Sequence, residues 1–268
     1  MTPITDQELA LFRRFIFEAA GITMSEQKKA LVEGRLSKRL TLHGLESFGQ
    51  YFKFLSSGEH PDEVQVAVDL LTTNETYFFR EEAHFEFLSK TIVAQHPAGM
   101  PFSLWSAASS TGEEIYTISF VLAETLGLDA NWTVTGSDIS TAVLATAQRG
   151  FYWLDRTRGL PQNYLRKYCL KGVRTQEGGF MIAPEIKRHT RFIQVNLNKT
   201  LPVVGKFHVI FLRNVMIYFD AETKRQVVAR LVEQLHPGGY FIVGHSESLN
   251  GLTDTLRAIK PTIYQLPA

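Results

Sequence analysis

The sequence has few of the features that mark secreted, membrane-spanning or nucleic-acid-binding proteins. Its 268 residues include one cysteine, Cys169, so no internal disulfide can form and a reducing compartment is favoured. No stretch approaches the roughly 18 to 20 uncharged apolar residues of a membrane span. The 28 basic residues balance 27 acidic ones, which argues against a dedicated binder of DNA or RNA. The N-terminus has no basic segment followed by an apolar run, so no secretory signal is expected. These absences predict a soluble, cytoplasmic protein.

The first 100 residues carry the apolar rhythm of helices. Thr5 and Glu8 have the spacing of a capping box, the apolar positions that follow recur every three or four residues, and Gly21 is placed to end this first helix. Further helices are predicted over residues 25–43, 47–55, 61–71 and 82–94. The Pro and Gly residues of 96–99 then predict a loop.

After Gly99 the pattern changes to strands alternating with helices. Strands are predicted at 102–105, 132–138, 207–212 and 240–244, and helices at 112–126, 140–149 and 221–235. This alternation is typical of a parallel sheet covered on both faces. Residues 168–196 interrupt it with glycines and short β-like runs, which predict a small antiparallel excursion that includes 190–195. Residues 262–266 are expected to add an edge strand.

In an open parallel sheet, ligands bind beyond the carboxyl ends of the strands. The second predicted strand ends at Asp138, and an ionised carboxylate there suits the two hydroxyls of a ribose. The turn after the first strand has Gly112 as its only glycine, so it lacks the G-x-G-x-x-G pattern that cradles a pyrophosphate. Glu113 and Glu114 would also repel phosphate. A nucleoside without phosphates fits better, and S-adenosylmethionine is the obvious candidate.

Each of these acids also has a simpler interpretation. Asp138 alone fits equally well as a capping acid just before Ser140. Glu113 and Glu114 alone fit as first-turn acids that are favoured by the helix dipole. The hypothesis of a nucleoside site depends on all three appearing in order around one crevice.

At these residues the chain resembles the CheR family of chemotaxis receptor methyltransferases, which are S-adenosylmethionine-dependent protein-glutamate O-methyltransferases. Minor departures from the family pattern are Ser140, where an acid is common, and Leu212, where a cysteine is common. The segments that carry the resemblance are LTTNETYFFR (71–80), WSAASSTGEE (105–114), GSDI (136–139), NL (196–197), RNVMIYFD (213–220) and GHSE (244–247).

The resemblance implies an α/β fold with a doubly wound, mostly parallel methyltransferase sheet. It implies an N-terminal all-helical domain (1–80) and a methyltransferase domain (81–268) with a small antiparallel β-subdomain inserted at about 168–194. The cofactor would be S-adenosylmethionine, leaving S-adenosylhomocysteine as product. The residues implied to contact it are Asn74, Thr76, Arg80, Ala107, Glu113, Asp138, Ile139, Asn196, Leu197, Arg213 and Asn214.

The implied reaction transfers a methyl group to the carboxylate of a receptor glutamate. A glutamate is already ionised at neutral pH, with an ordinary pKa of about 4.3, so the nucleophile needs no general base. The catalytic work is then alignment of the reacting atoms. Arg80 and Tyr218 are implied to face the reacting centre, Arg80 as a carboxylate clamp and Tyr218 as a hydrogen-bond donor.

The implied partner is the cytoplasmic helical bundle of a chemoreceptor, to which the enzyme would be recruited at the membrane without inserting into it. The predicted second helix carries a basic stripe of Lys28, Arg35 and Arg39, and these residues with Lys38 would meet the acidic methylation region of the receptor. By charge alone, a solvated basic face is the simpler interpretation of this stripe. Binding of a receptor C-terminal peptide by strand addition at the β-subdomain stays open.

Other functions have weaker support in the sequence. Gly244-His-Ser-Glu-Ser248 is a near miss to the hydrolase motif G-x-S-x-G and lacks its second glycine. The eight histidines are scattered along the sequence, so no metal site is predicted. Two alternatives remain open: the same methyl transfer on the receptor of a chemosensory-like pathway unrelated to motility, or a docking module that binds S-adenosylmethionine without turnover.

Overall fold

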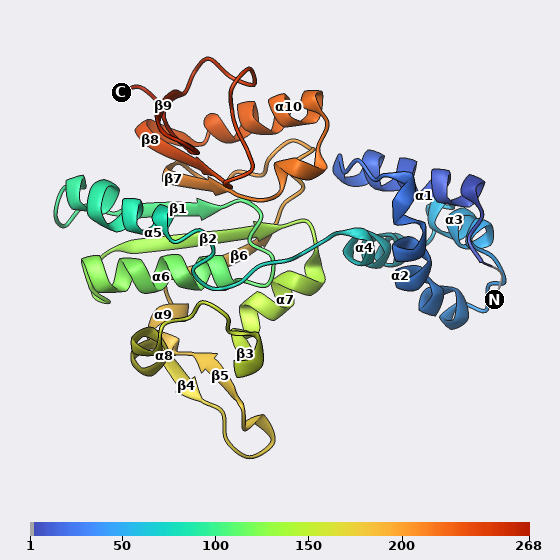
Figure 1. The fold of residues 1–268 in the computed structure, drawn as a ribbon, viewed down its shortest axis with the longest axis horizontal. Coiled ribbons are helices and arrows are strands. Elements are labelled where there is room, and N and C mark those ends of the chain that lie inside the picture. Colours follow the sequence, from blue (N-terminus) through green and yellow to red (C-terminus); the bar gives the residue numbers. More distant parts are fainter. Residues whose placement is uncertain (1–2) are drawn as a thin grey trace.

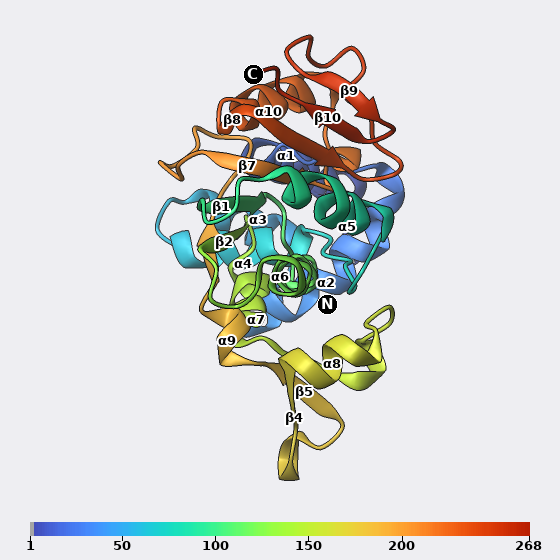
Figure 2. The ribbon, with the colours of Figure 1, turned by 90° about the vertical axis from the view of Figure 1, so that its left-hand side faces the viewer.

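A computed structural model describes residues 3–268, which form a helical bundle, a large α/β sheet and a small antiparallel sheet (Figure 1). The bundle lies beyond one end of the large sheet, and the small sheet projects from its side in both Figure 1 and Figure 2. No helix of residues 3–268 is long and apolar enough to cross a membrane.

The N-terminal bundle begins with the predicted capping box. The Thr5 hydroxyl accepts the Glu8 N–H at 3.2 Å, the Glu8 carboxylate accepts the Thr5 N–H at 2.9 Å, and Gly21 ends the helix with a left-handed φ of 72°. The apolar faces, including Phe12 and Leu36, pack together as a separate core. The bundle elements are α1 (Asp6–Ala20), η1 (Glu26–Lys28), α2 (Lys29–Leu42), α3 (Phe48–Ser56) and α4 (Pro61–Leu71).

The large sheet has the predicted mostly parallel arrangement. Its order is β6-β2-β1-β7-β8-β10-β9, and the strands from β6 to β8 run parallel, while β10 and β9 are antiparallel additions. Its strands are β1 (Phe102–Ser106), β2 (Trp132–Asp138), β6 (Thr190–Gln194), β7 (Phe207–Leu212), β8 (Leu235–Val243), β9 (Arg257–Lys260) and β10 (Ile263–Gln265).

Apolar residues alternate between the two faces of this sheet, so helices cover both. Leu104 and Phe211 belong to one core cluster and their neighbours Trp105 and Ile210 to the other, as the two-residue period of a strand requires. The first cluster contains residues of α5 (Ala83–Phe87), the π-helical turn η2 (Leu88–Val93) and α6 (Glu113–Leu126). The second contains residues of α10 (Ala221–Val232), and α7 (Thr141–Arg149) packs beside β2 and β6.

The small sheet differs from its predicted composition. Its order is β3-β5-β4, all antiparallel, so it includes a strand that precedes residue 168. The assignment of 190–195 to this excursion is wrong, because β6 pairs in parallel with β2. On β6, the Phe192 ring packs over Gly136, where an added Cβ would lie 2.9 Å from that ring. The centres of the Phe192 and Tyr116 rings are 6.1 Å apart. The strands are β3 (Phe151–Trp153), β4 (Cys169–Lys171) and β5 (Gly179–Ile182).

The remaining elements are short. The expected edge strand is present as β10, but β9 lies outside it and is the actual edge. Helix α10 ends at Val232, three residues before its predicted end, because β8 already begins at Leu235. The other elements are η3 (Leu154–Arg156), α8 (Gln162–Tyr168), η4 (Arg174–Gln176), α9 (Pro184–Lys187) and η5 (Met216–Tyr218).

The bundle is attached at the carboxyl ends of the parallel strands. The Thr23 N–H donates to the Tyr218 carbonyl at 2.7 Å, and the Asn196 side-chain amide donates to the Ala19 carbonyl at 2.6 Å. A Cβ on Gly21 would lie 2.8 Å from Thr223, so only glycine allows this approach. The end of α1 therefore covers the edge of the sheet where a ligand site is expected.

Candidate functional site

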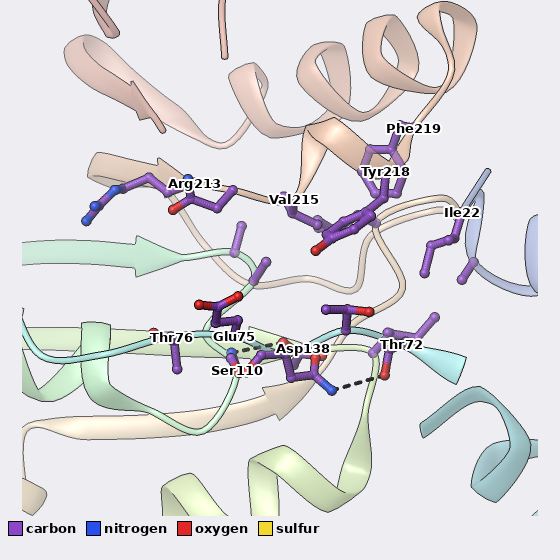
Figure 3. Close-up of a pocket in the computed structure, with 18 of the residues that line it drawn as sticks. Ile22, Thr72, Glu75, Thr76, Ser110, Asp138, Arg213, Val215, Tyr218 and Phe219 are labelled. Atoms are coloured by element: carbon purple, nitrogen blue, oxygen red, sulfur yellow. Dashed lines mark hydrogen bonds between the residues drawn. The ribbon is translucent and has the colours of Figure 1, made fainter. Parts of the chain in front are cut away.

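A cavity with an empty volume of about 850 Å³, including its open mouth, lies at the carboxyl ends of β1, β2 and β7 (Figure 3). The predicted cofactor residues that line it are Asn74, Thr76, Arg80, Ala107, Asp138, Ile139, Asn196, Leu197, Arg213 and Asn214, together with Tyr218. Glu113 is the predicted residue that does not.

Asp138 is buried at the end of β2, and its two oxygens are partly used by the backbone. One accepts the Ser110 N–H at 2.9 Å and the other the Ser140 N–H at 3.0 Å. Burial raises the pKa of Asp138, while these hydrogen bonds oppose the shift. The cap of α7 is the Ser140 hydroxyl, which accepts the Val143 N–H. Since an ionised carboxylate has about four acceptor positions, two remain for a ligand in the cavity.

The acids at the start of α6 differ in where they point. Glu114 lines the cavity, whereas the Glu113 carboxylate accepts the Thr111 hydroxyl at 2.6 Å. Glu114 is 3.1 Å from Arg213 and accepts the Ser106 hydroxyl at 2.7 Å. Burial raises the pKa of Glu114, and the charge of Arg213 opposes this. Consecutive helical residues are about 100° apart, and only the structure decides which one faces the cavity.

The side chain of Arg213 is buried, with 1% of it exposed. It lies 3.1 Å from both Glu81 and Glu114 and also donates to the Arg80 carbonyl. Its guanidinium extends away from the Tyr218 ring in Figure 3. Arg213 therefore holds the segment that carries Arg80 against the start of α6, and its charge is committed to protein carboxylates.

Arg80 is held in an unusual stretch of backbone. Its neighbours Phe79 and Glu81 have φ values of 57° and 59°, in the left-handed region that bulky residues rarely adopt. The guanidinium donates to the Glu75 carbonyl at 2.9 Å and lies over the Tyr77 ring. This conformation places the half-buried arginine at the cavity instead of in bulk solvent.

Tyr218 projects into the cavity from the loop after β7, opposite Asp138 and Glu75 (Figure 3). Burial raises the pKa of its phenol, with a further contribution from Glu75, against the charges of Arg80 and Arg35. The phenol therefore keeps its proton at neutral pH and is a hydrogen-bond donor.

Several lining residues were missed by the sequence reasoning. Glu114 is not among them, because it was already weighed as one of the three acids of the nucleoside site. Thr72, Thr73, Glu75, Ala108, Ser110, Val215 and Phe219 lie inside segments that carry the family resemblance, but nothing in those segments shows which side chains face the cavity. Ala20, Ile22 and Val195 lie outside these segments and had no signal.

The cavity fits a phosphate-free nucleoside better than a dinucleotide. Asp138, Glu75 and Glu114 face it, and α6 begins with acids where a phosphate-binding helix would present bare N–H groups. Ile22, Ile139 and Leu197 provide apolar surface for a base.

The predicted docking residues lie at the end of η1 (Lys28) and on α2, and only some of their charges are free. The Arg35 guanidinium donates to the carbonyls of Leu70 and Thr72 at 3.1 and 2.7 Å, and Arg39 pairs with Glu63 on α4. Lys28 and Lys38 are exposed. Of the proposed docking residues, the two lysines are the ones whose charges face solvent.

Packing within the small sheet itself explains two of its glycines. A Cβ on Gly172 would collide with the Gln176 carbonyl, and one on Gly179 with the Phe151 ring. They close the hairpin itself. The outer strands still present apolar side chains to solvent, with Leu170 53% and Trp153 44% exposed.

Comparison with protein families gives two adjacent matches. Residues 7–72 match the CheR methyltransferase all-alpha domain, and residues 74–265 match the CheR methyltransferase SAM-binding domain. Together they span almost the whole chain.

Similar curated proteins carry one name. A "Chemotaxis protein methyltransferase" of Salmonella typhimurium is 39% identical, covering 97% of this chain and 92% of its own length. That of Escherichia coli is 38% identical, covering 98% and 92%. "Chemotaxis protein methyltransferase 2" of Pseudomonas aeruginosa is 38% identical, covering 97% and 93%.

Proposed function

Because the chain belongs to the CheR methyltransferase family, we propose that it methylates glutamate side chains on the cytoplasmic helical bundle of a chemoreceptor. The protein is an S-adenosylmethionine-dependent methyltransferase of chemotaxis. The observation that carries this conclusion is the family match over 7–72 and 74–265.

In the proposed binding mode, Asp138 accepts the two ribose hydroxyls with the positions that the backbone leaves free. Glu114 or Glu75 faces the amino group of the methionine part, and Arg80 contacts the cofactor from the side of the reacting centre. Arg213 holds the site together through Glu81 and Glu114. Asn74, Thr76, Ala107, Ile139, Asn196, Leu197 and Asn214 complete the proposed contacts, and Glu113 acts behind them through Thr111.

When bound, S-adenosylmethionine supplies an electrophilic methyl group on a sulfonium. The acceptor carboxylate is ionised at neutral pH, which is why the site needs no proton acceptor. Arg80 orients this carboxylate, and Tyr218 donates to the oxygen that does not react. The surrounding walls, including the end of α1, exclude water and fix the approach.

Docking is proposed to use two exposed lysines, Lys28 at the end of η1 and Lys38 on α2. Arg35 adds to the positive field behind them, whereas the charge of Arg39 is paired with Glu63. The outer strands of the small sheet offer backbone hydrogen bonds and exposed Leu170 to an extended receptor C-terminal peptide. The proposed location of the enzyme is the cytoplasm, next to the membrane receptors that these contacts would bind.

The test is transfer of labelled methyl groups to purified cytoplasmic fragments of receptors from the same cell. The expected product is base-labile label on glutamate, lost in Arg80→Ala. Tight cofactor binding with no transfer to any receptor would instead favour a docking module. Label on a receptor outside the motility pathway would identify the chemosensory alternative.

A further inference from the structure

Behind the cofactor cavity, Glu81, His84 and His245 lie together at the ends of separate segments. One ligand-type atom from each lies within 4.8 Å of the others. Glu81 and His245 are 164 residues apart, so their proximity exists only in the folded chain. The sequence therefore contains no spacing of the three residues that predicts this cluster.

The hydrogen bonds around His84 fix which of its ring nitrogens carries the proton. The Thr262 hydroxyl donates to the Pro261 carbonyl at 2.6 Å, so its proton is used and its oxygen can accept. Nε2 of His84 lies 2.8 Å from that oxygen and must be the N–H donor.

In the neutral ring, Nδ1 of His84 therefore carries a lone pair, and this atom is buried. Its side chain is 2% exposed, and Nδ1 has no hydrogen-bond partner among residues 3–268. Nδ1 lies 3.5 Å from a carboxylate oxygen of Glu81. A lone pair and an ionised carboxylate repel each other, so this arrangement calls for a cation between them.

The separation suits a tetrahedral metal ion. With metal–nitrogen and metal–oxygen bonds of about 2.0 to 2.2 Å at a tetrahedral angle, the two ligand atoms would be about 3.4 Å apart. Two imidazoles and one carboxylate are a ligand set that zinc uses, with water in the fourth position. Thr262 orients the ring from behind, as hydrogen-bond partners of ligand histidines do at metal sites.

We propose that Glu81, His84 and His245 bind a divalent transition-metal ion of the zinc class, with water as the fourth ligand. His245 is exposed, which gives the ion an entry path and a ligand that can move. Arg213 lies beside Glu81, but it is shared with Glu114 at the same 3.1 Å, so two carboxylates face one guanidinium.

The ion would act as a structural clamp. Glu81 follows Arg80 directly and accepts the Asn214 side-chain amide at 3.2 Å and the His245 N–H at 3.1 Å. Metal binding would thus join the backbone that carries Arg80 to the end of β8. No part in the methyl-transfer step is assigned to it.

The test uses the full chain, treated with a chelator and then titrated with Zn²⁺ by calorimetry and with Co²⁺ by visible absorption. The expected result is one equivalent of Zn²⁺, a tetrahedral Co²⁺ spectrum, and a higher unfolding temperature with Zn²⁺. His245→Ala should weaken Zn²⁺ binding at least ~10-fold, because it removes a direct ligand. The control is His60→Ala on the distant bundle, which should bind as the wild type does.

Absence of binding and of any thermal shift in the wild type would overturn the proposal, as would equal Zn²⁺ affinity in His245→Ala and wild type. His245 is exposed, so its loss is not expected to prevent folding. The measurement needs neither cofactor nor receptor, so its failure leaves the proposed methyl transfer untouched.

Discussion

The carboxylate of Glu247 accepts the backbone N–H of Asn214 at 2.7 Å, although the two residues are 33 positions apart. The same carboxylate accepts the N–H groups of Met216 and Gly244, each at 2.8 Å. Asn214 has a left-handed φ of 58°. One buried glutamate therefore fixes the loop that carries Asn214 and Tyr218 into the cavity, which gives the GHSE segment a physical role.

Glu247→Ala should destabilise the fold by at least about 3 kcal/mol, because it leaves three backbone N–H groups without their acceptor. Denaturant unfolding measures this loss. Ser246→Ala, at the exposed neighbouring position, should stay within about 0.5 kcal/mol of the wild type. Equal stability of the two variants would show that Glu247 does not hold the loop.

Asp138→Ala should weaken binding of S-adenosylhomocysteine by about 2 to 4 kcal/mol, or about 30- to 700-fold, through the loss of two charge-assisted hydrogen bonds to the ribose. Calorimetric titration measures the affinity. Because the variant also loses acceptors for two backbone N–H groups, its unfolding free energy should fall as well.

Ser140→Ala separates these effects. It removes the cap of α7, which costs about 1 kcal/mol of stability, but leaves the Asp138 carboxylate in place. Its cofactor affinity should match the wild type. An Asp138→Ala protein that is destabilised yet binds normally would refute the ribose assignment.

Tyr218→Phe should lower kcat about 10- to 150-fold at saturating cofactor, since it removes one hydrogen bond to a charged group in the transition state. Cofactor affinity should change little. Tyr240→Phe, on β8 against Phe87, is the matched control and should be fully active. Since the pKa of Tyr218 is raised, its ionisation should cause no loss of activity from pH 7 to about 9. Full activity of Tyr218→Phe would contradict the donor role.

Glu63 should make the bundle sensitive to acid. Burial alone would raise its pKa, but hydrogen bonds from Arg39, Tyr51 and His43 outweigh this and lower the pKa to about 2. Because the folded pKa lies below the unfolded one, the stabilisation is present above about pH 4.5 and is lost as the pH falls toward 2. This contribution of ionised Glu63 to the free energy of unfolding is up to about 3 kcal/mol.

Unfolding curves from pH 6 to 2 measure this contribution. Glu63→Gln should be less stable at pH 6 and show a shallower loss on acidification, whereas the exposed Glu59→Gln should follow the wild type. The same pH dependence in wild type and Glu63→Gln would show that the Glu63 hydrogen bonds are not its source.

Reversing Lys28 and Lys38 to Glu should raise the KM for a receptor fragment several-fold at low salt and leave cofactor affinity unchanged, because exposed charges mainly guide encounter. Each lysine is also reversed alone. Lys53→Glu, on α3, changes the net charge by the same amount as either single reversal and is their control. Initial rates at two salt concentrations provide the measurement. Unaltered receptor kinetics at low salt would exclude Lys28 and Lys38 from the docking surface.

Local sequence patterns predicted most of the helices and strands, but they did not predict which distant segments pair. The capping box of Thr5 and Glu8 was readable because its two partners are three residues apart. The strand at Thr190–Gln194 was also readable, but nothing in its period-two pattern encodes that β2 is its neighbour. β3 has three residues, too few for any periodicity.

For the site as well, local features could be predicted from the sequence and long-range contacts could not. Asp138 was recognisable as an acid at the end of a strand, yet its hydrogen bond to Ser110 depends on how two loops meet. The pairing of Arg39 with Glu63 joins two helices and turns an apparent docking charge into a structural one. Such contacts depend on helix orientation, which a single sequence does not specify.

The central claim is that the cavity at the ends of β1, β2 and β7 accepts a nucleoside without phosphates. Parallel calorimetric titrations with S-adenosylhomocysteine and with NAD test it most directly. We predict saturable binding of S-adenosylhomocysteine that depends on Asp138, and no binding of NAD. Binding of NAD with no response to S-adenosylhomocysteine would contradict the claim.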